Sequence, residues 1–126
     1  MTVRDTLFTT LSEDSDVNAL VANTSSPLTY RIFPDVAPDN VVKPYIVYMV
    51  IGDRLPVVFN DVINIREFVL RIMTYATTAS GAHTLADHIV DAVNTSMNLA
   101  EVFNVGSDYD YDVKLYRYTC QLTVWH

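Results

Sequence analysis

The stretch KPYIVYMVIGDRLP, residues 43–56, decides what kind of sheet this chain builds. Pro44 opens an uncharged run and Gly52-Asp53 closes it, which is typical of a strand followed by a turn. A strand that is buried on one face only alternates apolar and polar side chains. This strand is apolar on both faces, with Tyr45, Val47, Met49 and Ile51 on one and Ile46, Tyr48 and Val50 on the other. Both faces therefore need cover, and a small chain has only one core to supply it.

The composition indicates a single domain that hides part of its surface against other proteins. The chain has 126 residues, a length that fits one domain over 1–126 with a core of useful size. Half of the residues are hydrophobic and 18% are charged, below the proportion of about a quarter that is usual in soluble domains. A composition with this many apolar residues is typical of a chain whose surface is covered in part by a partner.

The charge and the hydropathy pattern argue against two classes of partner. The formal net charge is −7, from 8 Lys and Arg against 15 Asp and Glu, and the basic residues are scattered along the chain. Nucleic-acid-binding surfaces gather Lys and Arg against phosphates, so we expect no sequence-specific nucleic-acid binding. No window of about 18 apolar residues occurs, so we expect no membrane partner.

The periodicity of the apolar residues predicts an α+β domain. The expected elements are a helix over 3–22 with a break at 12–15, strands over 28–33, 44–51 and 63–76, a helix from Thr78 or Ser80 to near Asn98, and a strand over 113–125. In this order, the N-terminal helices and the one long helix pack on one face of a mostly antiparallel, four-stranded sheet. The opposite face of the sheet then keeps apolar side chains that the helices do not cover.

The residues that carry chemistry do not form a recognisable catalytic, cofactor or metal site. Three widely separated glycines cannot build a phosphate-binding loop. His83 and Asp87 are four apart on the predicted long helix, but a catalytic zinc site needs a third ligand, so a weak surface pair is the simpler interpretation.

Asp108-x-Asp110-x-Asp112 resembles the start of a calcium loop but lacks its glycine and its glutamate. Cys120 lies in the middle of the last strand and is expected to be buried and inert. We therefore expect no enzyme and no cofactor.

The aromatic residues favour a subunit interface. Most of the eight tyrosines lie on or beside predicted strands, where a tyrosine buries its ring and keeps a polar partner for its hydroxyl. Residues 53–64 read as a long connection or projecting arm, which is apolar although it looks exposed. The alternative is that this arm folds back on its own domain. The predicted contact residues with a neighbouring subunit or a partner are Tyr45, Met49, Leu55, Val57, Val58 and Phe59.

The layout of the whole chain resembles that of a known family. The stretches that carry the resemblance are SEDSDVNALV, RIFPDVAPDNVVKPYIVYMVIGD, SGAHTLADHIVDAV and the closing LTVW. The order R-I-F-P…A-P…P-Y-I-V-Y, from Arg31 to Tyr48, is its most specific part. In this layout the chain resembles the tail-completion, or tail-terminator, proteins of bacteriophages with long non-contractile tails. The Asp108–Asp112 stretch and the arm are particular to this chain.

The resemblance implies a structural virion protein without enzymatic activity. Such proteins form a ring, usually hexameric, on the head-proximal end of the tail tube, having assembled in the host cytoplasm. The ring ends tube polymerisation and joins the tail to the head connector, so the implied partners are further copies of the chain, the tail tube protein and a connector or neck protein. DNA passes through the lumen without specific binding, and we expect Asp108, Asp110 and Asp112 to give an acidic lumen along which DNA slides.

Two other functions stay open at the level of the sequence. The chain could be another phage neck protein, such as a head-completion protein, or a minor tail protein. A more distant alternative is a module that binds a small molecule between helix and sheet, although no convergent set of polar residues supports it. A ring in solution would favour the terminator, and a monomer with a ligand cavity would favour the module.

Overall fold

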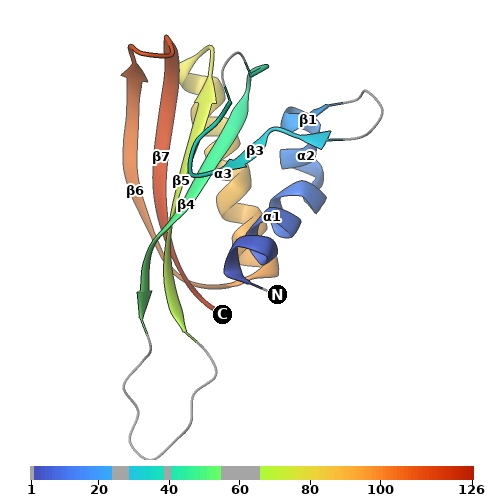
Figure 1. Cartoon of the computed structure of the whole chain (residues 1–126), viewed down its shortest axis with the longest axis vertical. Coiled ribbons are helices and arrows are strands. Elements are labelled where there is room, and N and C mark those ends of the chain that lie inside the picture. The colour runs from blue at the N-terminus through green and yellow to red at the C-terminus, as the bar shows by residue number, and fades with distance from the viewer. Residues whose placement is uncertain (1, 24–28, 39–40, 55–65) are drawn as a thin grey trace, which may run out of the picture.

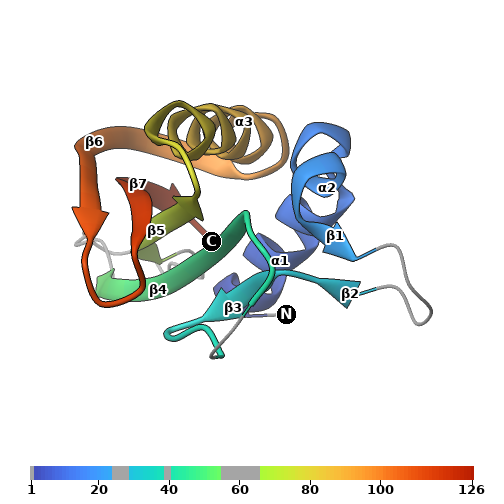
Figure 2. The same ribbon diagram turned by 90° about the horizontal axis from the view of Figure 1, so that it is seen from above.

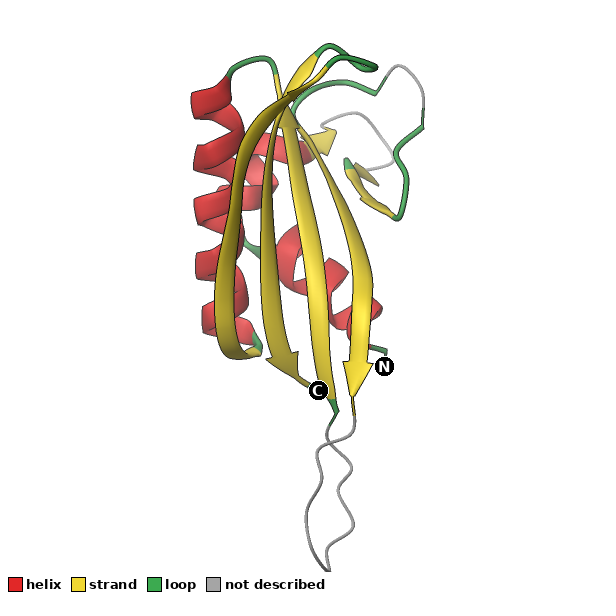
Figure 3. Cartoon of the chain, turned by 90° about the vertical axis from the view of Figure 1, so that its left-hand side faces the viewer, coloured by secondary structure: helices red, strands yellow, loops and turns green. Residues whose placement is uncertain are grey.

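Three helices cover one face of a five-stranded sheet (Figure 1). The computed structural model describes residues 2–23, 29–38, 41–54 and 66–126. The helices are α1 (Val3–Glu13), α2 (Ser15–Val21) and α3 (Ala79–Ser96). In Figures 2 and 3 all three helices lie on the same side of the strands, so the predicted α+β arrangement with one covered face is confirmed.

The main sheet is mixed and has the order β3-β4-β5-β7-β6. β3 and β4 run parallel, and the other neighbours in this sheet are antiparallel. A separate two-stranded ladder joins the short strands β1 and β2. The strands are β1 (Ala22–Asn23), β2 (Thr29–Tyr30), β3 (Ile32–Pro34), β4 (Tyr45–Arg54), β5 (Glu67–Ala76), β6 (Asn98–Asp110) and β7 (Leu115–Trp125).

The prediction of a four-stranded sheet was wrong in two places. The chain between α3 and the last strand forms the edge strand β6, whose pairing with β7 shifts register between Leu99 and Glu101 and again between Asn104 and Gly106. Each shift moves the following side chains to the other face, so the alternation that marks a strand is lost. The predicted strand 28–33 is also divided at Arg31 into two short strands that belong to different sheets.

Each helix begins at a side chain that accepts a hydrogen bond from the backbone of its first turn. Thr2 and Asp5 form a capping box at α1, and the Asp14 carboxylate accepts from two backbone N–H groups at the start of α2. The Thr78 hydroxyl accepts from the N–H of Gly81 at α3. Such caps satisfy N–H groups that have no partner within the helix. The predicted break between α1 and α2 is confirmed, and of the two starts predicted for the long helix the structure has Thr78.

The core lies between the helices and the covered face of the sheet. The covered face carries the even-numbered residues of β5 and β7 and those of β4 up to Val50, where the register shifts. The largest fully buried side chains there are Leu7, Leu11, Val17, Val21, Leu85, Ile89 and Val93 from the helices and Ile46, Leu70, Ile72, Leu122 and Val124 from the strands. Full burial stabilises the fold by about 1.5–3 kcal/mol per side chain of this size. This layer accounts for one face of the sheet and leaves the odd-numbered residues on the other.

Candidate assembly surface

The face of the sheet that points away from the helices is called the open face here. It carries the odd-numbered residues of β5 and β7, the odd-numbered residues of β4 up to Met49, and the residues of β6 that pair with them. Rows of side chains run across it in register. The rows are Tyr45–Tyr75–Arg117–Asp108, Val47–Met73–Thr119–Gly106 and Met49–Arg71–Gln121–Phe103. Within the described residues no helix packs on this face.

One end of the open face is covered by the chain itself. Tyr45, Val47, Tyr75 and Leu115 form a second buried cluster, against which side chains of the connection between β3 and β4 pack. The rings of Tyr45 and Tyr75 stack with their centroids 4.8 Å apart. Burial raises the pKa of the Tyr45 hydroxyl. Tyr45 is only 6% exposed. Its ring therefore packs within this end of the open face and is not available to a partner.

A cavity of about 570 Å³ lies between this connection and the sheet. Its lining combines the rings of Tyr45 and Tyr75 with charged residues at the rim, among them Asp35, Lys43 and Asp112. The polar groups at the rim come from different loops, and none of them forms a catalytic arrangement. The cavity therefore marks where the covered end of the open face gives way to solvent.

The rest of the open face has no cover within the described part of the chain. Met49, Val69, Met73 and Gln121 are half-buried by their neighbours in the sheet. Phe103, on the edge strand β6, is 60% exposed. Met49 was predicted to lie at an interface, and the structure places it in the centre of this surface. The other predicted contact residues, Leu55, Val57, Val58 and Phe59, lie outside the described residues.

Arg71 is the charged residue in the middle of the open face, in register between Met49 and Gln121. Its Nε is buried and has no hydrogen-bond partner in the described part of the chain. Other arginines with described side chains are paired. Arg4 contacts Asp35 at 3.3 Å, and Arg66 contacts Asp53 at 3.4 Å. Arg71 is not among the residues predicted from the sequence, although a lone cation on an otherwise apolar strand face is a usable signal.

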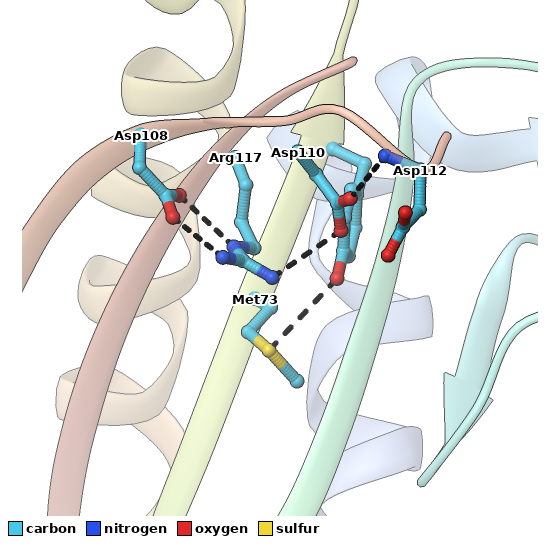
Figure 4. A network of polar contacts seen from close by, with 6 residues as sticks. Met73, Asp108, Asp110, Asp112 and Arg117 are labelled. Carbon is cyan, nitrogen blue, oxygen red and sulfur yellow. Dashed lines mark hydrogen bonds and ion pairs between the residues drawn. The ribbon is translucent and has the colours of Figure 1, made fainter. Parts of the chain in front are cut away.

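Two of the three predicted acidic residues are paired with Arg117 across the β6–β7 hairpin (Figure 4). The Arg117 guanidinium donates through Nε to Asp108 Oδ1 at 2.9 Å, and through Nη2 to the other oxygen of the same carboxylate. Its Nη1 donates to Asp110 Oδ2 at 3.4 Å. The hydrogen bonds from Arg117 hold the pKa of Asp108 below its usual range. The backbone N–H of Asp112 donates to Asp110 Oδ1 at 3.0 Å, which helps to close the hairpin.

This pairing reduces the negative charge of the hairpin. Three carboxylates share the neighbourhood of one guanidinium, and Asp112 is the exposed member of the set that is not paired with Arg117. Opposite charges across a hairpin were visible in the sequence as Asp108 and Arg117, but their pairing depends on a register that only the structure gives. Beside them the ring of Tyr109 contacts those of Tyr111 and Tyr116, and Tyr111 is 82% exposed.

The residues that the sequence offers as metal ligands or as a reactive thiol lie apart from the open face. His83 and Asp87 form a 3.5 Å pair on the exposed side of α3. Cys120 is fully buried, and burial raises the pKa of its thiol to about 11. Among the described residues there is no group of His, Cys, Asp and Glu that could hold a metal ion. None of the described helices is both long and apolar enough to cross a membrane.

Comparison with protein families gives one match that covers nearly the whole chain. Residues 5–126 match the family described as tail completion protein gp17. No curated protein matches the chain. The match includes α1 from residue 5 onward, the other two helices and every described strand. The chain therefore belongs to the tail completion protein gp17 family, a family of bacteriophage tail proteins.

Proposed function

We propose that the chain forms a hexameric ring at the head-proximal end of the phage tail tube. The ring ends polymerisation of the tube and joins the tail to the head connector. Membership of a tail-completion family supports the place in the tail. The observation that carries the ring is the open face, on which no described helix packs and where Phe103 is 60% exposed, while only one end is covered by the connection between β3 and β4.

In this proposal neighbouring subunits supply the missing cover. A contact between two different surfaces of the same protein repeats from copy to copy and closes when the rotation divides a full circle. Met49 on the open face and the apolar side chains of Leu55, Val57, Val58 and Phe59 are the proposed contact residues. Tyr45 is buried and packs against Tyr75 at the covered end of the open face, where it holds the neighbouring strands in place. The tail tube protein and a connector protein are the proposed partners on the two ends of the ring.

The acidic hairpin is proposed to line the lumen through which DNA passes. Because Arg117 is paired with Asp108 and Asp110, the hairpin presents a smaller net negative charge than its three carboxylates alone. A weakly negative wall repels phosphate without trapping counterions, so DNA slides along it. Asp112 is exposed and is not paired with Arg117, so its charge is not offset by that guanidinium.

The proposal is tested by electron microscopy of lysates from a phage that lacks this protein. Tubes that grow beyond their normal length, unattached to heads, are the expected result, since nothing ends polymerisation. Tubes of normal length beside heads that have lost their DNA would instead identify a head-completion protein. Light scattering of the purified protein, alone and with tubes, measures whether six copies assemble.

A further inference from the structure

β6 is the strand at one edge of the main sheet, and no described strand pairs with its outer side. It has 13 residues, and between its two register shifts residues 101–104 pair regularly with β7. An edge strand offers outward N–H and C=O groups to a further strand, so a long edge is usually shortened, charged or covered. Phe103, in the regular stretch, is 60% exposed. This stretch is therefore suited to pair with a strand from outside the subunit.

The opposite edge of the sheet is covered only in part. β3 pairs with the first part of β4, as far as Tyr48, and no described strand pairs with the outer side of β4 over residues 49–54. Ile51 in this stretch is 42% exposed. The Tyr48 carbonyl accepts a 2.8 Å hydrogen bond from the Asp35 N–H on the β3 side. Because successive residues of a strand direct their backbone groups to alternate sides, Val50 directs its N–H and C=O groups to this same outer side.

On β6 the backbone groups of Val102 also point outward. The backbone of His126, just beyond β7, exchanges two hydrogen bonds of 2.9 Å with Arg66 on the β5 side. By the same alternation Leu122 directs its backbone groups towards β5 and away from β6. Val102 is the partner of Leu122 in β6, and two opposed residues of an antiparallel pair either bond each other or both point away. The N–H and C=O groups of Val102 therefore lie at the outer edge of the sheet.

The two outward-pointing valines lie in one row, on strands that run in opposite directions. Val50, Leu70, Leu122 and Val102 are in register across the sheet. Each step along this row is antiparallel, so β6 runs opposite to β4 (Figure 1). A second copy in the same orientation, rotated about an axis parallel to the strands, brings its β4 beside β6 as an antiparallel neighbour. Direction and level then match without any shift along the strands.

The side chains at the two edges fit the same pairing. Val50 and Val102 are both partly buried against the core on the covered face, so joining the edges extends the cover over both. On the open face, placing Val102 opposite Val50 brings Phe103 next to Met49 of the second copy. A methionine packs well against an aromatic ring, and the contact covers a phenylalanine that is exposed in the isolated subunit.

We propose that β6 of one copy pairs with β4 of the next copy, with Val102 opposite Val50, so that the sheet continues from copy to copy. Each copy uses two different edges, so the contact has the head-to-tail form that closes into a ring. Closure leaves neither of these two stretches as a free edge, which is how closed sheets avoid unpaired strands. The inference rests on the proposed function, because it specifies which surfaces meet within the proposed ring.

Disulfide trapping tests which edges meet. Across the proposed contact Met49 and Phe103 form a pair whose Cα atoms lie about 4.5 Å apart, within the range of a disulfide. Within one chain they are three strand spacings apart in their row, about 14 Å, which is too far for a disulfide. A chain that carries both Met49→Cys and Phe103→Cys can therefore be joined only to other copies through this pair.

This double variant is oxidised mildly, alone and with tail tubes, and separated without reductant. We expect a ladder of covalent multimers about ten times more abundant than in the matched control, in which Thr84→Cys on the exposed side of α3 replaces Phe103→Cys. Cys120 is buried and can remain in both chains. A yield of multimers equal to that of the control would overturn the inference.

A proline at the outer edge tests the backbone pairing itself. Val102→Pro removes an N–H that the subunit's own sheet does not use, a position at which an edge strand tolerates proline. Val102→Ala shortens the same side chain but keeps the N–H. In the double-cysteine chain we expect about tenfold fewer multimers with Val102→Pro than with Val102→Ala. Equal yields from the two variants, both shown to be folded by circular dichroism, would overturn the strand pairing.

Val50→Pro and Val50→Ala repeat this comparison at the other edge, and they replace it if Val102→Pro fails to fold. Light scattering on the same samples separates the inference from the proposed function. Rings of six copies without covalent multimers would leave the ring in place and refute the contact. Copies that never assemble, alone or with tubes, would refute both. Rings whose copies become linked through Met49→Cys and Phe103→Cys support both.

Discussion

Arg31 joins three separate stretches of backbone with one side chain. Its Nη2 donates to the carbonyl of Leu20 at 2.8 Å, its Nη1 to that of Ala22 at 3.4 Å, and its Nε to that of Pro44 at 3.0 Å. The residue is 9% exposed. It lies between β2 and β3 and thereby fixes the end of α2 against the start of β4. An arginine suits this position because its planar guanidinium carries N–H donors that point in several directions.

Arg31→Met is expected to lower the free energy of unfolding by about 3 kcal/mol, because it leaves three partly buried carbonyl groups without their donors. Arg66→Met is the control, since the ion pair of Arg66 with Asp53 is half-exposed and is worth less than about 1 kcal/mol. Chemical denaturation of both variants measures the difference. Equal losses in the two variants would contradict the role given to Arg31.

The pairing of Asp108 with Arg117 makes the stability of the fold depend on pH in the acid range. The hydrogen bonds from Arg117 lower the pKa of Asp108, so the folded state holds its carboxylate charged more firmly than the unfolded state does. The resulting stability is present above the ordinary Asp pKa of about 3.9 and is lost as the pH falls through the lower folded value. The carboxylate is about half exposed (52%), so the effect is below about 1 kcal/mol.

Asp108→Asn should therefore lose less stability than the unaltered protein between about pH 4 and pH 2. Thermal unfolding over this range measures the two slopes, and Asp91→Asn on the exposed side of α3 is a control for the loss of one carboxylate. Parallel slopes for the unaltered protein and Asp108→Asn would show that the pairing with Arg117 does not stabilise the fold.

At the scale of elements, β6 shows how a strand departs from regular pairing. Gly106 has φ +125°, a backbone conformation that side chains with a Cβ rarely adopt, and it lies at the second register shift. No atom lies within 4 Å of the position that a Cβ would take. The need for glycine here is therefore conformational and not a matter of space.

Gly106→Ala is expected to destabilise the fold by about 1–2 kcal/mol through backbone strain alone. Gly52→Ala is the matched control in β4, also beside a register shift, where φ is not in the positive region and the new methyl group meets Val69 at 3.4 Å. Denaturant titration compares the two. A loss for Gly106→Ala no greater than for Gly52→Ala would contradict the argument from φ.

The same element explains which parts of the fold could be predicted from the sequence. Helices α1 to α3 and strand β7 keep a regular apolar period, which reports the covered face directly, whereas β4 and β5 are recognisable as apolar runs between turns. β6 changes face twice at its register shifts, so its pattern fits neither a helix nor a strand. The cover over Tyr45 depends on residues that follow β3 and pack across the sheet, and no local pattern reports such a contact.

At the scale of the whole molecule, the two faces of the sheet have different partners. The covered face packs against three helices within the subunit. On the open face Phe103 is exposed and Met49 and Arg71 are partly exposed, and no described helix packs against them. The two-faced apolar strand in the sequence predicted this imbalance, and Met49, a predicted interface residue, lies on the open face. Arg71 was missed because one charged residue in an apolar strand looks like an ordinary exception until its neighbours are known.

The central claim is that the open face is buried between copies in the assembled tail. Hydroxyl-radical footprinting of the protein in purified tails, compared with separated monomers, tests this claim most directly. The account predicts that Met49, Met73 and Phe103 are modified several-fold less in tails, while Met97, which packs against the core on the helix side, serves as the internal reference. Equal modification of the three open-face residues in tails and in monomers would contradict it.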